Sequence, residues 1–300
     1  MITTSAPGKV ILFGEHAVVY GEPALVCAID KRVYIHASKV PSGLKIISGK
    51  SKDFRYVKKA VELVFEHAGK KCGLDIKIDS ELPPASGLGS SAAVSVATIL
   101  AVSELLGAKL SKAEIAKLGH KAELEVQGAA SPTDTAISTF GGVLFIQPKK
   151  KYQRINAALP LVVGYTGVER STKILVQNVR SLKEKFPEIV NPIIRDIGKI
   201  TRKAKRRLEN NEDVGELMDI NHGLLCALGV STEKLNELVY AARKAGAKGA
   251  KLTGAGGGGC MIACVPKNAE KVARAIEACG CTALRAPISK EGARVEKHAI

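Results

Sequence analysis

The pattern of apolar and polar residues predicts several strands in the first third of the chain. Apolar runs rich in β-branched residues cover residues 10–13, 24–29 and 33–37, and glycines and a proline separate the first two. Residues 74–79, LDIKID, alternate between apolar and polar positions, which is typical of a strand with one buried face. The chain is therefore expected to begin with a sheet.

Two helices are expected next. Residues 91–106 are apolar nearly all round, which predicts a helix that is buried on every side. Ser111 and Glu114 have the spacing of a capping box, so a second helix should begin there, continue to about Gln127 and end at Gly128. Two glycines then lead into a short apolar strand, VLFI, at residues 143–146.

A change of composition at residues 149–154, KKKYQR, marks a candidate domain boundary. Beyond it the pattern predicts a strand at 161–164, four helices, a glycine-rich loop, a strand at 260–265, a helix at 268–279 and two short closing strands. The four helices are expected at about residues 172–185, 188–210, 213–227 and 232–245. Because strands and helices mix without a βαβ rhythm, we predict the α+β class, with one domain over residues 1–155 and another over 156–300.

The composition is that of a globular protein with a large core, since 46% of its 300 residues are hydrophobic. The longest apolar run, residues 92–106, is too short to span a bilayer, and the first residues, MITTSAPGK, lack the pattern of a secretion signal. The seven cysteines form no CxxC pair and no zinc-type spacing, which favours reduced, buried thiols. We therefore expect a cytoplasmic protein without a membrane partner.

The formal net charge of +16 raises the question of a polyanionic partner. Its densest basic segment, KITRKAKRR at residues 199–207, carries its charges at helical spacing, as a solvated helix face does. Aromatic residues make up only 4% of the chain, tryptophan is absent, and no nucleic-acid-binding motif is visible. We expect no nucleic-acid partner.

Two glycine-rich segments are candidates for ligand binding. The first, PPASGLGSSAA at residues 83–93, opens the predicted buried helix. Intervening prolines separate it from the preceding strand, and no lysine follows its glycines, so it fits neither the dinucleotide fingerprint nor the P-loop. The positive end of a buried helix is a good anion site. A glycine turn followed by a serine N-cap explains the same residues equally well.

The second glycine-rich segment, KLTGAGGGGC, holds five glycines among residues 254–259 and precedes a strand. So many glycines are costly in backbone entropy for a plain connection. They favour a close approach of the backbone to a ligand or to the other domain.

Charged candidates accompany these loops. Lys9 stands at the mouth of the first strand, and Glu15 with His16 occupies the turn after it. Glu123 shares a helical stripe with small residues, which leaves room for a ligand or simply forms a packing stripe below a surface carboxylate. Asp134, in SPTD, is placed either to cap a helix or to face a substrate. The residues by themselves leave these alternatives open.

Taken together, PGKVILFGEHAVVYG, PPASGLGSSAA and KLTGAGGGGC resemble, in order and character, the three signature segments of the GHMP kinase superfamily. The resemblance extends from about residue 5 to 265. It implies a two-domain α+β fold, with an N-terminal domain like domain 2 of ribosomal protein S5 and a ferredoxin-like C-terminal domain. Within the superfamily, GEHAVVYG and AELEVQGAASPTDTAISTFGG are most similar to the compact archaeal members that phosphorylate mevalonate.

The resemblance also implies the roles of individual residues. It assigns Asp134 to accept the proton of the attacking hydroxyl, Lys9 to steady that hydroxyl and the transferring phosphoryl group, and Ser91 with Glu123 to hold Mg²⁺. The residues implied to bind the phosphates of ATP are Pro84, Ala85, Ser86, Gly87, Leu88, Gly89, Ser90 and Ser91. The residues implied to contact the acceptor are Glu15, His16, Thr172, Arg180 and Gly256.

The expected activity is thus Mg²⁺-dependent phosphoryl transfer from ATP to mevalonate in isoprenoid biosynthesis. One alternative is a related kinase acting on phosphomevalonate or another small alcohol. Another is a non-catalytic member that senses a ligand. The oligomeric state is open, with a homodimer among the expectations.

Overall fold

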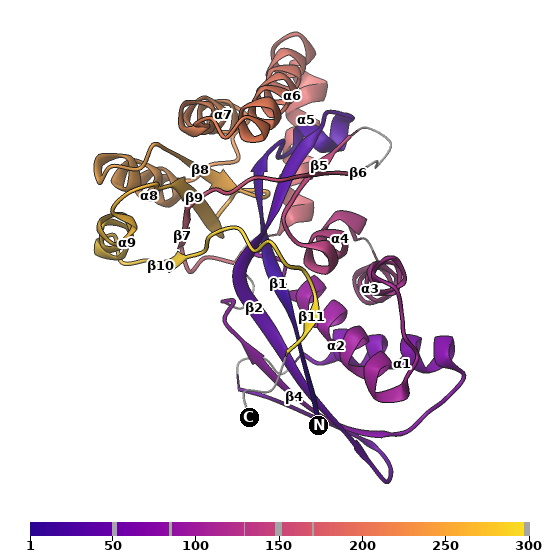
Figure 1. Cartoon of the computed structure of the whole chain (residues 1–300). Helices are drawn as coiled ribbons and strands as arrows, with labels where there is room; N and C mark the ends of the chain where they lie inside the picture. The colour runs from indigo at the N-terminus through magenta and orange to yellow at the C-terminus, as the bar shows by residue number, and fades with distance from the viewer. Residues whose placement is uncertain (50–52, 84–85, 129, 148–151, 170, 297–300) are drawn as a thin grey trace.

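The computed structural model describes residues 1–49, 53–83, 86–128, 130–147, 152–169 and 171–296. Its strands form two sheets, each covered by helices; the long strands β1 (Ile2–Phe13) and β2 (Ala24–Val40) of the first sheet run up much of the molecule, and the second sheet lies beside their upper part (Figure 1). All seven cysteines are free thiols, as the sequence predicted, but only Cys27, Cys260 and Cys264 are fully buried. The prediction of buried thiols was wrong for the other four, which are half-buried. Among the described residues, none of the helices combines the length and the apolar character that crossing a bilayer requires.

The first sheet is built on two long antiparallel strands, β1 and β2. Its path runs β11–β1–β2–β4–β3, with β5 pairing to the other end of β2 and β6 pairing to β5. Among the described strands of this sheet, β3 and β4 alone are parallel neighbours. The bounds of these strands, in chain order, are Ile2–Phe13, Ala24–Val40, Leu44–Ser48, Gly73–Ser80, Val143–Ile146, Tyr152–Ile155 and Arg294–Val295.

The strand β2 is one continuous element of 17 residues, where the sequence predicted two shorter strands. The prediction separated them at the charged residues 30–32, but Arg32 is only 1% exposed and lies within the strand. Its guanidinium donates to Ser5 Oγ at 2.7 Å and to the carbonyl oxygen of Gly292 at 2.6 Å, among other acceptors. Because these bonds satisfy the buried cation, the strand continues through it.

Helices cover one face of the first sheet, with α2 at the centre. Nearly every residue from Ala92 to Ser103 is buried in α2, as its apolar sequence predicted. The predicted capping box of α3 is present, with both Ser111 and Glu114 engaged, and α3 ends at Gly128. No element was predicted from the sequence over the residues that form β3 and α1. The helix bounds are Arg55–Ala68 for α1, Ser90–Leu106 for α2, Lys112–Gln127 for α3 and Pro132–Phe140 for α4.

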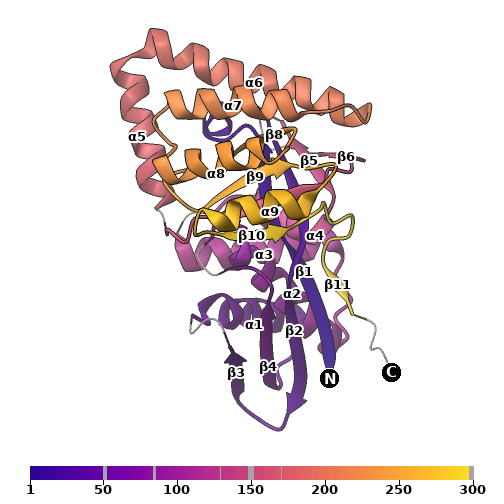
Figure 2. The same ribbon diagram turned by 90° about the vertical axis from the view of Figure 1, so that its left-hand side faces the viewer.

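The second sheet is fully antiparallel in the order β10–β7–β9–β8, and α8 and α9 lie in front of it in Figure 2. The strand bounds are Leu161–Tyr165 for β7, Gly249–Thr253 for β8, Cys260–Cys264 for β9 and Thr282–Arg285 for β10. The helix bounds are Thr172–Lys185 for α5, Pro187–Glu209 for α6, Gly215–Ala227 for α7, Glu233–Lys244 for α8 and Ala269–Ala278 for α9.

The basic segment at residues 199–207 lies on α6, as predicted for a helix face. Thr201 and Ala204 are buried, whereas Lys199, Lys203 and Arg206 are exposed. Several of its cations pair with acids of the same chain, among them Lys199 with Asp196 and Arg202 with Glu22.

The two halves contact each other in several places besides the chain connection. A short 3-10 helix, η1 (Ala17–Tyr20), follows β1 and contacts α6. The chain also returns at its other end, where β11 pairs with β1 in the first sheet. A boundary near residue 155 stays a prediction, and the segment that carries β11 belongs spatially with the first half.

Candidate active site

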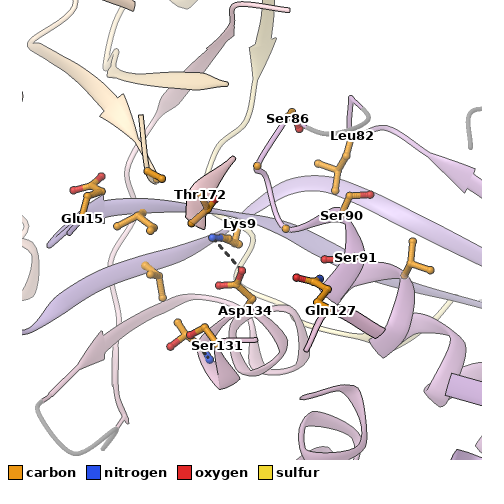
Figure 3. Close-up of a pocket in the computed structure, with 18 of the residues that line it drawn as sticks. Lys9, Glu15, Leu82, Ser86, Ser90, Ser91, Gln127, Ser131, Asp134 and Thr172 are labelled. Atoms are coloured by element: carbon orange, nitrogen blue, oxygen red, sulfur yellow. Dashed lines mark hydrogen bonds and ion pairs between the residues drawn. The ribbon is translucent and has the colours of Figure 1, made fainter. Parts of the chain in front are cut away.

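A cavity of about 930 Å³ opens where the start of α2, the start of α4, β1 and the loop after β8 meet (Figure 3). Its wall combines residues from both halves of the chain, including Lys9 and Asp134 from the first half and Thr172 and Ala255 from the second. Of the residues predicted to bind the phosphates, Ser86, Gly87, Gly89, Ser90 and Ser91 line it. Pro84 and Ala85 lie outside the described residues.

The N-terminus of α2 faces this cavity without a side-chain cap from any described residue. Gly89 occupies the N-cap position with φ 77°, so the alternative prediction of a serine N-cap is wrong. A Cβ at Gly89 would lie 2.7 Å from Lys9 Cγ, and the Lys9 N–H donates to the Leu88 carbonyl oxygen at 2.8 Å. Glycine is therefore needed both for the backbone angle and for the close passage of the lysine.

Ser91, in the first turn of α2, donates its hydroxyl to Glu123 Oε1 at 2.6 Å. Glu123 is 3% exposed, and this burial raises the pKa of its carboxyl to about 7. The hydrogen bond from Ser91 and the charge of Lys9 act in the opposite direction, whereas Asp134 raises the pKa further. A buried carboxylate and a hydroxyl thus meet beside the helix start.

The small residues next to Glu123 on α3 do not make room for a ligand. A Cβ at Gly119 would lie 3.1 Å from Val96 of α2 and 3.3 Å from Thr135 of α4. The stripe therefore serves close helix packing, which was part of one of the two interpretations of the sequence. That interpretation also placed the carboxylate at the surface, which is wrong because Glu123 is buried.

Asp134 lies in the first turn of α4 and pairs with Lys9, with 3.2 Å between Nζ and Oδ2 (Figure 3). Ser131 caps the helix by accepting from the N–H of Thr133, and Pro132 occupies the first helical turn. The cap does not use the Asp134 carboxylate, which faces the cavity. Farther along α4, Ser138 Oγ donates to the Pro7 carbonyl oxygen at 2.8 Å and fixes the helix against β1.

On the acceptor side, His16 and Thr172 line the cavity. His16 has φ 58°, and its Nε2 donates to the Ala255 carbonyl oxygen at 2.9 Å. Glu15 lies at the cavity wall with its side chain fully buried, and its carboxylate is bound by Lys251 of β8. Glu15 is thus held by the protein rather than presented to the cavity.

Two residues predicted to contact the acceptor are not brought to the cavity wall. Arg180 is exposed on α5, where its charge acts on Tyr20. Gly256 packs against the segment before α8, since a Cβ there would lie 2.0 Å from the Val230 carbonyl oxygen. Of the glycine-rich loop, Gly254 and Ala255 line the cavity.

Several polar residues of the cavity wall were not predicted to be site residues, although Ser131 had been predicted as a helix cap and Gln127 as the end of a helix. These polar residues are Ser48, Asp53, Tyr56, Ser80, Gln127, Ser131 and Thr133. Tyr56 comes from α1, whose four-residue spacing of Val57, Val61 and Phe65 was a usable helical signal. Gln127 follows Glu123 by one helical turn, so its side was predictable once Glu123 was placed.

Comparisons with known proteins show to which family the chain belongs. Residues 55–142 match the GHMP kinases N terminal domain model, residues 201–280 match the GHMP kinases C terminal model, and residues 2–39 match the galactokinase galactose-binding signature. A mevalonate kinase of Pyrococcus abyssi is 50% identical, with 99% of this chain and 98% of the relative covered.

Solved structures give the same picture. The crystal structure of the Methanococcus jannaschii mevalonate kinase aligns with a TM-score of 0.86 at 32% identity, covering 96% of this chain and 98% of that one. The L. major mevalonate kinase in complex with R-mevalonate aligns with a TM-score of 0.87 at 29% identity, covering 95% of each chain. These alignments confirm the predicted two-domain fold. By its identity to these relatives over almost its whole length, the chain belongs to the GHMP kinases and, within them, to the mevalonate kinase family.

Proposed function

We propose that this protein transfers the γ-phosphoryl group of ATP to the 5-hydroxyl of (R)-mevalonate, giving 5-phosphomevalonate for isoprenoid biosynthesis. The single observation that carries the proposal is the Lys9–Asp134 pair beside the open N-terminus of α2, in one cavity. Phosphoryl transfer asks a protein mainly for alignment and for positive charge around the transferring group. A helix N-terminus and a lysine supply that charge.

The triphosphate is assigned to the segment from Ser86 to Ser91. Its glycines let the backbone approach a ligand closely, and the first N–H groups of α2 point into the cavity as donors. The nucleoside then lies toward the end of the cavity lined by Tyr56 and Gln127, and the acceptor toward His16 and Thr172.

Ser91 and Glu123 fit a Mg²⁺ site. Both offer oxygen ligands, which Mg²⁺ prefers, and Glu123 gains from a cation because its burial otherwise favours the neutral acid. The described residues hold no group of three or more His, Cys, Asp or Glu side chains that could bind a metal alone. That suits an ion that takes its other ligands from substrate phosphates and water, where it neutralises the charge on the phosphates.

Asp134 is proposed to accept the proton of the attacking hydroxyl. A hydroxyl within hydrogen-bond reach of both Lys9 Nζ and the Asp134 carboxylate would donate its hydrogen to Asp134, while Lys9 stabilises the negative charge on the oxygen and on the phosphoryl group. A weak base suffices because the transition state is loose and the proton moves late.

The wall at the acceptor end favours a branched hydroxy acid over a sugar. Its side chains are largely apolar, and they are Ile11, Val18, Val19, Ala24, Val26, Ile146 and Val176. Such a wall packs against methyl and methylene groups, whereas the several hydroxyls of galactose would be left without partners. The match to a galactose-binding signature covers β1, the following turn and most of β2, which do not by themselves choose the acceptor.

A coupled assay of ADP release tests the proposal, with (R)-mevalonate, phosphomevalonate, galactose and homoserine as separate acceptors and with Mg²⁺ present or removed by chelation. We expect Mg²⁺-dependent turnover with mevalonate alone. Turnover with another acceptor would reassign the substrate. Tight ATP binding without turnover on any acceptor would support a non-catalytic ligand-sensing protein and overturn the proposal.

A further inference from the structure

The buried ion pair between Glu15 and Lys251 has no role in the phosphoryl transfer described above, although it lies directly behind the acceptor end of the cavity. Both side chains are fully buried. Lys251 Nζ donates to Glu15 Oε1 and also to the Leu252 carbonyl oxygen at 2.6 Å. Asn221 of α7 donates to the second carboxylate oxygen, Glu15 Oε2, at 3.4 Å. Glu15 therefore has both oxygens occupied by the protein.

The pair is one of three consecutive ties between the two halves of the chain. Along β8 and the loop after it, residues 251, 253 and 255 each contact the first half. Thr253 Oγ1 donates to the Ile11 carbonyl oxygen and accepts from the Ile11 N–H, each at 2.9 Å. The Ala255 carbonyl oxygen accepts from His16. Because alternate residues of a strand point to the same side, Lys251 and Thr253 of β8 both face the first half. The backbone carbonyl of Ala255, just after β8, continues the same line of contacts, so the three ties form one seam.

The seam ends at the cavity. Ile11, His16 and Ala255 belong to it and also line the cavity wall. His16 adopts φ 58°, which a non-glycine residue adopts only when its surroundings hold it there. Glu15, its chain neighbour, is anchored by Lys251, and both side chains of this ion pair are fully buried.

We propose that Lys251 is a positioning residue, and that its ion pair with Glu15 sets the acceptor end of the cavity by holding the His16 turn against Gly254 and Ala255. Glu15 then acts through Lys251 and does not contact the acceptor. The proposal rests on the proposed function, since it concerns the acceptor site of the same reaction. A displacement of about 1 Å in such a wall is sufficient to cost up to about a hundredfold in rate.

Three variants test it: Glu15→Gln, Lys251→Met and the double variant. Each single variant leaves one buried polar group without its partner and loses stability, whereas the double variant removes both charges and should recover most of it. We expect the KM for mevalonate to rise at least about tenfold in each, with the KM for ATP within about twofold of the parent. The KM for mevalonate of the double variant should be no higher than that of either single variant, because the two residues act as a unit.

The control is the neutralised pair Glu22→Gln/Arg202→Met, which also joins the first half to the second but is partly exposed. It should keep both KM values. Two outcomes would overturn the proposal: a double variant with parental KM for mevalonate and only lower stability, or a Glu15→Gln variant impaired far more than Lys251→Met, as direct acceptor contact requires. If no variant folds, Glu15→Asp, which keeps the charge and shortens the reach, must raise the same KM.

Failure of the proposed function is a separate result. It appears in the parent protein as absent turnover with mevalonate. In that case the same variants are compared with whichever acceptor the parent does phosphorylate, and the acceptor KM remains the quantity that decides.

Discussion

Burial shifts the pKa values of Glu123 and His222 in opposite directions, and in both cases it favours the neutral form. Desolvation raises the pKa of the Glu123 carboxyl to about 7 and lowers the pKa of the His222 imidazole to about 4, since both groups lose water in their charged forms. His222 accepts from the Leu252 N–H through Nδ1 and contacts Asn236 Oδ1 at 3.1 Å through Nε2. The bond from the backbone N–H requires an unprotonated Nδ1, so the folded protein holds the neutral imidazole with its proton on Nε2.

Acid should therefore weaken the fold through His222. The folded pKa of about 4 lies below the ordinary value of 6.5, so the unfolded chain binds the extra proton between these pH values. The free energy of unfolding should fall as the pH drops through this window, by at most about 3 kcal/mol from this group. Lys251 and Arg243 face the ring and act in the same direction.

Urea unfolding of the parent and of His222→Gln at a series of pH values measures this effect. The glutamine keeps a hydrogen-bond donor and an acceptor but does not titrate. The free energy of unfolding of the variant should therefore depend less on pH between about 4 and 6.5 than that of the parent. Equal pH dependence in the two proteins would contradict the assignment.

The Lys9–Asp134 pair supports a second prediction at the residue scale. Asp134→Asn and Lys9→Ala should each fold, because both side chains border the cavity rather than the hydrophobic core, and each should lower kcat by about two to three powers of ten. Steady-state kinetics and thermal unfolding of the same preparations check both parts. Asp196→Asn, which breaks an exposed ion pair with Lys199 on α6, serves as control and should keep full activity. Near-parental kcat in either site variant would remove that residue from the reaction.

For individual residues, the sequence indicated which side chains belong to the site but did not indicate which residues they contact. Lys9, Glu123 and Asp134 stood out by residue type and motif, and the structure places Lys9 against Asp134. The ion pair of Glu15 with Lys251 joins residues 236 positions apart, and no local pattern carries that information. Glu15 consequently was expected at the acceptor, although its carboxylate is bound within the protein.

Among the elements, strands with a buried cation were the hardest to predict. Lys251 stands in β8, a strand buried at all five positions, and Arg32 stands in β2. A charged residue in a sequence normally indicates an exposed position. For this reason β8 was not predicted, and β2 was predicted as two strands instead of one. Elements with strong local signals, such as α2 and the capped α3, were predicted closely because their pattern needs no distant partner.

Arg32 supports a prediction about the elements it connects. It donates to Ser5 on β1 and to Ser289 and two carbonyl groups in the segment that leads to β11. Arg32→Met would leave several of these acceptors buried and unpaired, so we expect the free energy of unfolding to fall by about 3 kcal/mol or more. Urea denaturation measures it.

The matched control is Arg274→Met, which removes an exposed pair with Glu270 and should change stability by less than about 0.5 kcal/mol. A small change for Arg32→Met, similar to that of the control, would mean that water or other groups satisfy the acceptors instead.

Over the whole molecule, the net charge of +16 favours small anions. The proposed substrates are both anionic, so the overall field should raise their concentration near the protein and help them enter the cavity. The basic face of α6 contributes to this field, since Lys203 and Arg206 are exposed there.

The ratio kcat/KM for mevalonate should accordingly fall severalfold as the ionic strength rises from about 20 mM to about 200 mM, because the Debye length shortens over that range. The assay is run at constant free Mg²⁺ and repeated with choline chloride and with potassium acetate. Values that are insensitive to salt would contradict a role for the overall charge, and a dependence on one salt alone would indicate binding of a specific ion.

The return of the chain to the first sheet has a practical consequence. The Glu296 N–H donates to the Thr3 carbonyl oxygen at 2.8 Å, so the two ends of the described chain are immediate neighbours, as Figure 1 also shows. A short flexible linker could close the polypeptide into a ring, and new ends could be opened in the exposed connection between α6 and α7. Such a circular permutant would keep every contact of the seam, whereas separate expression of residues 1–155 would yield a sheet that lacks its border strand.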